Sequence, residues 1–558
     1  MGAALELLWQ LALHLMLTGL PAALAAFVAM RRGLREVPLL LCVALAASGA
    51  GAMLVFWAFW ADPLLGQAAA FLLVLGSVQG IVLCRPDRLD RELLRELAVP
   101  AALWALASAF VVYLGFLYGG SGDPLTLAAT RFSHPLPADN QIPAYFADWL
   151  YDHGHSPVPP PFADWLSSDR PPLQIGYALG QRPFGWDESG LHYEVLGVVV
   201  QQLWIVGMWA LLLAARVGPL ARGLAIVAAL ASDVAIVHGF FVWPKLIAAA
   251  FALAALAMLV SAAWPRLRRE PWAAVLFAAL CALAMLAHGA SAFVLIPLLG
   301  LAALRGLPSA RWLGVAALVA VVFLAPWSAY QRFADPPGDR LLKWQLGGSL
   351  AIDDRGALET IVDGYREAGL DGTLANKWGN VTKIVGQRES EEGLDAAAGF
   401  AGEGDWNGFV ASLRFPRFMS LLPFLGLLLL GPLAMAVARV RGSPAGPEWR
   451  FALVALGFCL AAAAVWTLLM FGEPESSTSL HQGSLLVPLL AASGCAVAAC
   501  AASARLGVAL VALNAVFVLA LFASAPTLEP RSFSAFAAVL AAAGLGGFLW
   551  VALRPARR

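Results

Sequence analysis

The sequence predicts an all-α protein that crosses a membrane many times, and its composition and its long apolar runs both indicate this fold class. Of its 558 residues, 60% are hydrophobic and 13% are charged, and the mean hydropathy is +0.76. Soluble domains carry about 25% charged residues. Runs of the roughly 20 apolar residues that cross a hydrocarbon core recur along the chain. Short clusters of Arg, Pro and Gly separate them.

The charge and the cysteines narrow the classes of function. The formal net charge is +0, so the chain has no basic field that would attract nucleic acid. Its six cysteines, at 42, 84, 281, 459, 495 and 500, lie inside apolar runs and lack metal-ligand spacing. This favours packing over disulfides or a metal site. The first apolar run follows residues 1–6 without a basic leader, so we expect no cleavable signal.

Fifteen apolar runs predict a bundle of about 15 transmembrane helices with two extracytoplasmic loop regions. The runs lie near residues 7–29, 38–61, 64–84, 98–118, 191–214, 221–243, 246–264, 272–288, 290–304, 312–331, 417–438, 450–471, 483–503, 506–525 and 533–553.

Arginine clusters orient these spans. With fifteen crossings, every connection rich in arginine falls on one side, which the positive-inside rule makes cytoplasmic. A single helix over 272–304 would move the later clusters to the other side, so a hairpin is predicted there. The clusters are Arg31, Arg32 and Arg35; Arg85, Arg88, Arg91 and Arg95; Arg216 and Arg222; Arg266, Arg268 and Arg269; Arg305 and Arg311; Arg439, Arg441 and Arg450; Arg505; and Arg554, Arg557 and Arg558.

Two connections, 119–190 and 332–416, are too long for turns, and both fall on the outer side. The second has many more acidic than basic residues, which indicates a small extracytoplasmic subdomain with a solvated, charged face. The chain then divides into an N-terminal three-span extension (1–97), a membrane core that carries the first outer loop (98–331), the acidic subdomain (332–416) and the C-terminal spans (417–558).

The first outer loop contains two segments with amphipathic spacing. Ile142, Phe146 and Leu150 recur at helical intervals, with Tyr145 and Trp149 beside them, so we expect a helix lying along the membrane interface. Phe-Ala-Asp-Trp-Leu occurs at 146–150 and again at 162–166, which predicts a second interfacial helix. A duplicated functional motif is the alternative to chance similarity between two amphipathic turns.

Arg170 is the strongest candidate for binding an anion. It precedes Pro171 and Pro172, which keep the local backbone out of a regular helix. A guanidinium held at the membrane surface is always charged and offers five donors, which suits a phosphate. The alternatives are a snorkelling side chain and an ion pair with Asp169.

Further ionisable residues fall in the outer half of the membrane, where they are costly unless they face a cavity or a partner. Lys245, after the Trp-Pro break at 243–244, is placed to meet a lipid phosphate or to snorkel. The others are Asp233, His238, His288 at the tip of the hairpin, and Glu473, His481 and Gln482. Asp233 is either an ion-pair partner of Lys245 or His238, or a second acidic group. For the histidines the alternative is a structural hydrogen bond.

Two segments of the first outer loop resemble motifs of the GT-C superfamily of glycosyltransferases. Asp139-Asn140 is similar to the Asp-Glu pair of the lipid A aminoarabinose transferases and protein O-mannosyltransferases. Residues 169–174, Asp-Arg-Pro-Pro-Leu-Gln, resemble their Lys-Pro-Pro-Leu segment. The match covers only 139–174. It departs from the family at Asn140 and Arg170, and three additional spans precede the loop.

The resemblance implies a GT-C-like bundle that transfers a sugar from a polyprenyl phosphate donor to an extracytoplasmic glycan, lipid or protein acceptor. Asp139 would be the general base of an inverting reaction, with Asp233 as a second acidic group. Arg170 and Lys245 would bind the donor phosphate. The substrate-binding candidates are Asn140, Asp169, Gln174, His238, His288 and His481. The reaction needs no cofactor, and a divalent metal is an alternative because His and Asp lie nearby.

Two other classes of function are the alternatives. A transporter or flippase of polyprenyl-linked glycans would place charges near the bilayer midplane and show repeated halves, and the sequence has neither. An O-antigen ligase or polymerase would also use outward-facing cations, but with a diphosphate leaving group. We expect a multi-pass protein of a bacterial inner (plasma) membrane, with the active site facing outside.

Overall fold

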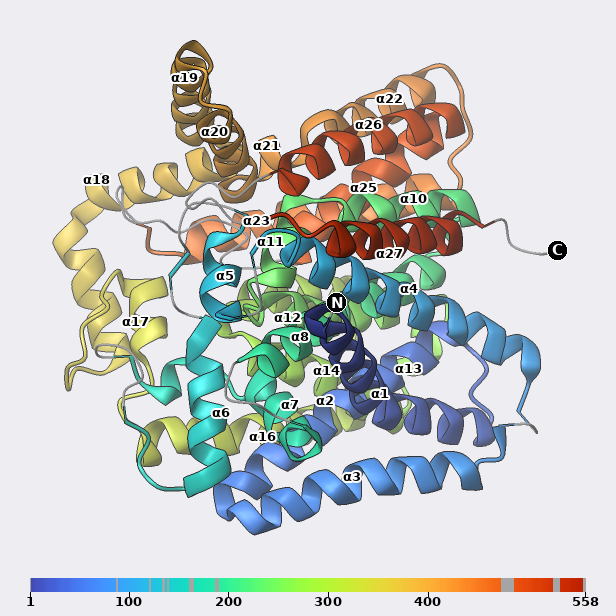
Figure 1. The fold of residues 1–558 in the computed structure, drawn as a ribbon, viewed down its shortest axis with the longest axis vertical. Coiled ribbons are helices and arrows are strands. Elements are labelled where there is room, and N and C mark those ends of the chain that lie inside the picture. The colour runs from blue at the N-terminus through green and yellow to red at the C-terminus, as the bar shows by residue number, and fades with distance from the viewer. Residues whose placement is uncertain are drawn as a thin grey trace.

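The chain forms a helical bundle (Figure 1). The computed structural model describes residues 2–86, 89–119, 122–132, 136–137, 140–159, 165–185, 190–472, 486–524 and 532–554. Within these ranges the regular elements are helices, and the only extended pairing is an isolated bridge between Tyr118 and Phe533. The prediction of an all-α fold is confirmed.

The helices of the N-terminal half run to the hairpin that was predicted over 272–304. They are α1 (Gly2–Arg31), α2 (Val37–Ala61), α3 (Pro63–Leu83), α4 (Arg91–Gly115), α5 (Pro124–Thr130), α6 (Gln141–His153), η3 (Ser167–Asp169), α7 (Leu173–Gln181), η4 (Arg182–Phe184), α8 (Leu191–Gln201), α9 (Trp204–Ala214), α10 (Pro219–Leu230), α11 (Asp233–Phe240), α12 (Lys245–Val260), α13 (Trp264–Leu267), α14 (Pro271–Ala287), η5 (Gly289–Ser291) and α15 (Ala292–Leu304).

The helices of the C-terminal half include the second long connection. They are α16 (Ala310–Ala329), η6 (Tyr330–Ala334), α17 (Arg340–Gly347), α18 (Ala357–Val385), α19 (Gln387–Glu403), α20 (Trp406–Met419), α21 (Leu421–Leu425), η7 (Gly426–Leu429), α22 (Leu430–Val440), α23 (Pro447–Leu469), α25 (Leu486–Ala502), α26 (Ala504–Ala523) and α27 (Ala535–Leu553).

Ten helical segments in the described part of the chain are long and apolar enough to cross a membrane, and the bent pair α10–α11 raises the number to 11. The other four predicted spans are the shorter helices α12, α14, α15 and α25. A helix of 16 residues such as α12 is about 24 Å long, which is less than the roughly 30 Å of the hydrocarbon core. The long helices therefore indicate a multi-pass membrane protein. Fifteen crossings would require the four shorter helices to span the membrane as well.

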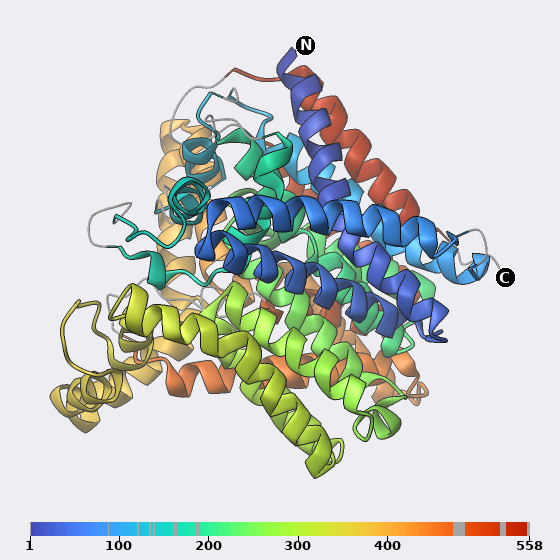
Figure 2. The ribbon, with the colours of Figure 1, turned by 90° about the horizontal axis from the view of Figure 1, so that it is seen from below.

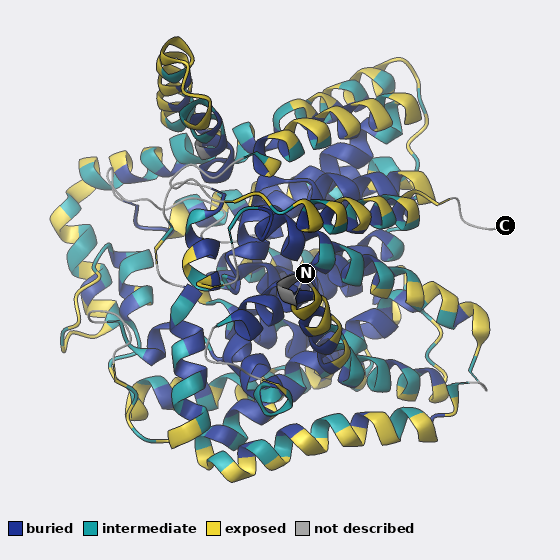
Figure 3. Cartoon of the chain, viewed as in Figure 1, coloured by how far each residue is buried: buried dark blue, intermediate teal, exposed yellow. Residues whose placement is uncertain are grey.

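Burial separates the helices into an interior set and a peripheral set (Figure 3). Helices α8, α12 and α25 are buried along nearly their whole length. The peripheral helices α3, α16, α22, α26 and α27 instead expose leucine and valine, such as Leu72, Leu318 and Val539. Exposed apolar side chains on membrane-length helices indicate contact with lipid. A lipid bilayer around the bundle explains this pattern.

The arginine-rich turns meet at one end of the bundle. Arg31 donates to the carbonyl of Cys84 at 2.7 Å, and Arg266 pairs with Glu36 at 2.7 Å. Arg268 donates to the carbonyl of Leu307 at 3.3 Å, so the two ends of the α14–α15 pair lie together. The hairpin predicted over 272–304 is therefore present, and His288 lies at its turn.

The two long connections lie at the opposite end. Figure 1 shows α5, α6, α17 and α18 at the left of the bundle, while the C-terminus and the α3–α4 turn lie at the right. Figure 2 shows, from another side, the yellow and brown helices of residues 340–419 gathered away from the C-terminus. The bundle thus has an arginine-rich end and an end built from the long connections, which we call the loop end.

Glycines allow several helices to pack backbone to backbone, as is common between membrane helices. A Cβ atom on Gly176 of α7 would come within 2.3 Å of the carbonyl oxygen of Ala52 in α2. On Gly180, one turn further along α7, the nearest atom would be 3.7 Å away. Only Gly176 is therefore required for the close approach of α7 to α2.

We predict that Gly176→Ala destabilises the protein and that Gly180→Ala does not. The first change forces α7 away from α2, which should cost about 1–3 kcal/mol as overpacking does elsewhere. The second meets ordinary van der Waals distances and gains helix propensity. Thermal melting of both purified variants in detergent tests this. Equal melting temperatures would show that α7 does not depend on the contact.

Candidate functional site

Arg170 has an extended backbone conformation and lies between two helices. The short helix η3 ends at Asp169, Arg170 has φ −121° and ψ 119°, and α7 begins at Leu173 after the two prolines. The expected effect of Pro171 and Pro172 on the backbone is confirmed. Arg170 is nevertheless 6% exposed, so it lies beneath the surface of the loop end.

The segment that carries Arg170 is held by residues that follow α16. The hydroxyl of Ser167 donates to Asp335 at 2.5 Å and lies 2.6 Å from the hydroxyl of Tyr330. The backbone N–H of Ser168 donates to the same Asp335 carboxylate at 2.9 Å, and Gln331 donates to the Ser168 carbonyl at 3.0 Å. The two long connections are thus joined through residues about 165 positions apart.

Two guanidinium groups share one aromatic ring at this junction. The Cζ atoms of Arg170 and Arg340 lie 4.8 Å and 4.3 Å from the ring centroid of Trp165. Arg340 also approaches the Asp169 carboxylate at 3.8 Å and donates to the Leu350 carbonyl at 2.9 Å. Cation–π contacts of this kind stabilise a desolvated guanidinium without neutralising it.

Asp169 is the carboxylate at the centre of this cluster. Its Oδ2 accepts a hydrogen bond from the backbone N–H of Leu166 at 2.9 Å, and its buried Oδ1 has no hydrogen-bond partner among the described residues. Burial raises the pKa of Asp169, although the Leu166 N–H and the charges of Arg170 and Arg340 oppose this. The group is therefore a more basic carboxylate than an exposed aspartate.

Lys245 and His288 are two further predicted residues near Arg170. Lys245 is the first residue of α12 and is 3% exposed, and its Nζ lies 3.4 Å from the ring centroid of Trp243. His288 is close enough to interact electrostatically with both Lys245 and Arg170. The structure thus brings Arg170, Lys245 and His288, predicted from three separate segments, into one region. The Nδ1 of His288 accepts a hydrogen bond from Ala290 N–H at 3.2 Å.

Gln174 holds the backbone around this region. Its amide donates to Tyr193 Oη at 2.6 Å and to the Val242 carbonyl at 2.8 Å, and it accepts from Gln201 at 2.9 Å. Gln201 in turn accepts the backbone N–H groups of Leu246 and Ile247 at the start of α12. The network ties α7 to the turn before Lys245, so Gln174 is placed as a positioning residue.

Asp233 and His238 lie on α11, beside α20. Asp233 is fully buried and pairs with Arg417 at 2.8 Å, so its partner is neither Lys245 nor His238. Arg417 also donates to the carbonyls of Pro423 and Phe424. The ring of His238 packs 5.2 Å from Phe418 and 5.8 Å from Trp243. Asp233 therefore joins α11 to α20, and His238 lines the path from there to Trp243.

The predicted interfacial helix of the first loop exists, but its apolar face meets protein. Helix α6 covers Gln141–His153, and Ile142, Phe146 and Leu150 are each 1% exposed. Phe146 packs edge-on against Phe56 of α2. The amphipathic helix is present as predicted. Its apolar face, however, is covered by a neighbouring helix and not by lipid. The second predicted helix, at 162–166, lies mostly outside the described residues.

Five predicted residues lie in or beside segments outside the described residues. Asp139, Glu473, His481 and Gln482 lie in those segments, and Asn140 lies beside one. Asn140 is fully buried next to Asp139, where its amide donates to the Leu125 carbonyl at 3.1 Å and its Oδ1 has no partner among the described residues. Asn140 thus anchors the start of α6 to α5.

The sequence did not point to several residues of this region. Arg340 and Asp335 contact the Arg170 segment but lie in the other long connection, in a stretch without a recognisable motif. The one signal was Asp335 itself, which precedes Pro336 and Pro337 as Arg170 precedes its own proline pair. Glu194 was also missed, because it lies in an apolar run. It is fully buried in α8, and its carboxylate has no hydrogen-bond partner among the described residues.

Neither metal ligands nor similar proteins assign a function to this site. Among the described residues, no group of three or more His, Cys, Asp or Glu side chains is placed to hold a metal ion. No family model matches the chain, and no curated protein or solved structure matches it significantly. The function must therefore be argued from the site itself.

We predict that Asp335→Ala loosens the Arg170 segment. The change removes a charged acceptor from Ser167 and Ser168, and hydrogen bonds to charged groups contribute about 1.5–3 kcal/mol. Backbone amides of 166–170 should therefore exchange with solvent at least about tenfold faster, as measured by hydrogen–deuterium exchange. Asp354→Ala, an exposed aspartate nearby, is the matched control. Unchanged exchange in both variants would mean that Asp335 does not hold the segment.

Proposed function

We propose that this protein is an integral membrane glycosyltransferase that moves a sugar from a polyprenyl phosphate donor to an extracytoplasmic acceptor. The observation that supports it best is that Arg170 and Arg340 lie beside Asp169 at the loop end of an apolar bundle, with His288 near both Arg170 and Lys245. The likeness of 139–174 to GT-C motifs adds independent support.

The cations suit a lipid phosphate. An isoprenoid tail remains in the bilayer while its phosphate lies at the end of the bundle, within reach of Arg170 and Lys245. Buried cations hold a phosphate more strongly than exposed ones because less water screens the charges. They also stabilise the charge that grows on the leaving phosphate, at the stage where fixed electrostatics accelerate a reaction most. Arg340, which the sequence did not indicate, becomes a third phosphate-binding candidate.

The proposed reaction is a single displacement. The acceptor hydroxyl oxygen attacks the anomeric carbon, the bond between that carbon and the phosphate oxygen breaks, and the polyprenyl monophosphate departs with the bonding electrons. The acceptor proton passes to the Asp139 carboxylate. Attack opposite the leaving group inverts the anomeric configuration. Asp169 keeps Arg170 and Arg340 in place, and His288 lies near Arg170 and Lys245.

We also propose an orientation for the bundle and a number of membrane crossings. The arginine-rich end faces the cytoplasm and the loop end faces outside, with the chain crossing a bacterial inner membrane about 15 times. The interior helices α12 and α25 then cross where other helices shield them from lipid. A flippase is disfavoured because the charged cluster lies at one end of the bundle and not at its middle.

We predict that a cysteine at Glu391 reacts with a membrane-impermeant maleimide added to intact cells, and that a cysteine at Arg441 does not. Both positions are exposed, one at the loop end and one at the arginine-rich end. The unsubstituted protein, whose six cysteines are buried or half-buried, is the control. The opposite labelling would reverse the topology and place the site in the cytoplasm.

We predict that Arg170→Ala raises the KM for a polyprenyl phosphate sugar by about tenfold or more, and that Arg170→Lys has a smaller effect. Lysine keeps the charge but loses the planar fork of donors. Initial rates with varied donor concentration give the comparison, and Arg182→Ala, an arginine on η4 that pairs with Asp148, is the control. An unchanged KM in both Arg170 variants would rule out a phosphate-binding role.

We predict that Asp139→Asn lowers kcat by about 10²–10⁴-fold, the usual range for loss of a general base. An amide keeps the shape of the carboxylate but accepts no proton. Asparagine caps helices as well as aspartate does, so a merely structural Asp139 would tolerate this change and fail only as Asp139→Ala. Asp169→Asn should instead act mainly on the donor KM. A near-normal kcat for Asp139→Asn would contradict this role and leave Asp169 as the candidate general base.

A further inference from the structure

A second candidate site lies in the subdomain of residues 332–416. It is separate from Arg170, Arg340 and Lys245, which we call the arginine cluster. It is a cleft of about 630 Å³ between α17, α18 and the loop that joins them. Small-molecule sites commonly have volumes of about 300–1,000 Å³. Along α18 the cleft follows one helical stripe, formed by Thr360, Asp363, Gly364, Glu367, Ala368, Gly372 and Asn376.

Glycines shape the walls of this cleft. A Cβ on Gly364 would come within 2.4 Å of the Gly347 carbonyl oxygen, so α17 and α18 touch through their backbones at one end of the cleft. Gly369 has φ 61° and ψ −169°, which divides α18 into two segments. Lining residues come from both segments, before and after this kink. The cleft thus opens beside the glycine contact and continues past the kink.

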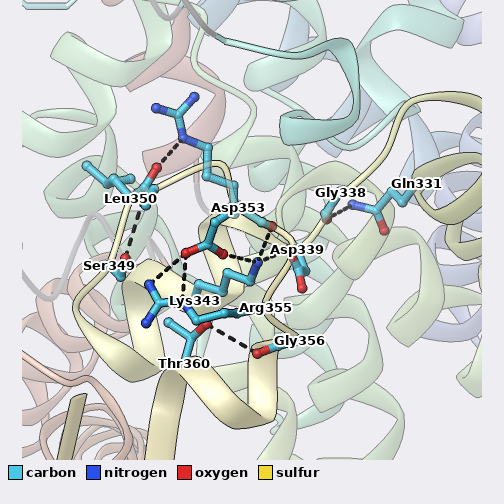
Figure 4. A network of polar contacts seen from close by, with 12 residues as sticks. Gln331, Gly338, Asp339, Lys343, Ser349, Leu350, Asp353, Arg355, Gly356 and Thr360 are labelled. Carbon is cyan, nitrogen blue, oxygen red and sulfur yellow. Dashed lines mark hydrogen bonds and ion pairs between the residues drawn. The ribbon is translucent and has the colours of Figure 1, made fainter. Parts of the chain in front are cut away.

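The opposite wall is a loop fixed by ion pairs, which Figure 4 shows. Asp353 pairs with Arg355 at 2.6 Å and with Lys343 at 3.2 Å, and Lys343 also pairs with Asp339 at 3.1 Å. Arg340 binds the carbonyl of Leu350 in the same loop. The loop that contributes Ser349 and Arg355 to the cleft is therefore tied to the first half of α17 through Arg340 and Lys343.

The polar groups of the cleft are available to a ligand. Asn376 is 8% exposed and its side chain makes no hydrogen bond within the described chain. Its amide atoms reach the solvent that fills the cleft, so a ligand can bind them there in place of water. Glu367 lines the same hollow without an ion pair among the described residues, and Phe471 supplies an apolar ring that is 7% exposed.

We infer that this cleft binds a carbohydrate and is the acceptor site of the transferase. The inference of an acceptor rests on the proposed function. Carboxylates and an amide accept and donate hydrogen bonds to hydroxyl groups, and an apolar ring suits the C–H face of a sugar. Exposed glycine backbone allows close approach of a ligand. An anionic ligand is disfavoured because Asp363 and Glu367 oppose it, and Arg355 is already paired with Asp353.

The position of the cleft suits an acceptor. Helix α17 begins at Arg340, beside Asp169, and ends at Gly347, in the wall of the cleft. Its eight residues are about 12 Å long, which is the length of a short oligosaccharide. A glycan chain held in the cleft can therefore extend one end toward the arginine cluster.

The test is binding of the full-length protein in detergent to an array of immobilised neutral, acidic and amino oligosaccharides, without donor. Ala368→Phe fills the cleft, and Asn376→Ala removes the unpartnered amide without adding bulk. Ala375→Phe is the matched control, because it places the same side chain on an exposed position of the same helix. Thermal melting confirms that each variant folds.

We expect the unsubstituted protein and Ala375→Phe to bind the same glycans. Ala368→Phe and Asn376→Ala should bind them at least about tenfold more weakly, because a site built to bind hydroxyls depends on each partner. Failure of the unsubstituted protein to bind any glycan, or equal binding by every variant, would overturn the inference. If binding follows this pattern but no sugar is transferred, the transferase proposal fails and the carbohydrate site remains.

Discussion

The organisation of the loop end depends on keeping three cations charged where water is scarce. Arg170, Arg340 and Lys245 are each no more than 6% exposed. Removing such groups from water is expensive unless partners replace the lost hydration. The indole rings of Trp165 and Trp243 and the Asp169 carboxylate supply these partners. The rest of the loop end serves to hold these groups together.

This requirement explains why distant segments meet. The first long connection contributes Trp165, Asp169 and Arg170, and the second contributes Asp335 and Arg340. Asp335 holds Ser167 and Ser168, and Asp169 pairs with Arg340, so each connection supplies partners to the other. Deeper in the bundle, Gln174 and Gln201 fix the start of α12 and so place Lys245. The packing of α7 against α2 through Gly176 supports the whole arrangement from below. A fault in any of these contacts should therefore reach Arg170.

The sequence predicted the helices well because apolar length and arginine position are local signals. It also predicted the turn at His288, since only a hairpin keeps Arg305 beside Arg268. It could not predict contacts between segments. The apolar face of α6 gave no sign that α2 would cover it, and Asp233 gave no sign that Arg417, 184 positions later, would pair with it. The sequence did not indicate Arg340, because its importance comes from its position next to Arg170, 170 residues earlier in the chain.

The proposed function depends on the binding of a lipid phosphate by the arginine cluster. An electron cryomicroscopy map of the full-length protein with a non-hydrolysable polyprenyl phosphonate sugar analogue would test it most directly. We expect headgroup density within hydrogen-bonding distance of Arg170 and at least one of Lys245 and Arg340, with the tail leaving toward the bilayer. Headgroup density elsewhere, with the cluster unchanged, would contradict it.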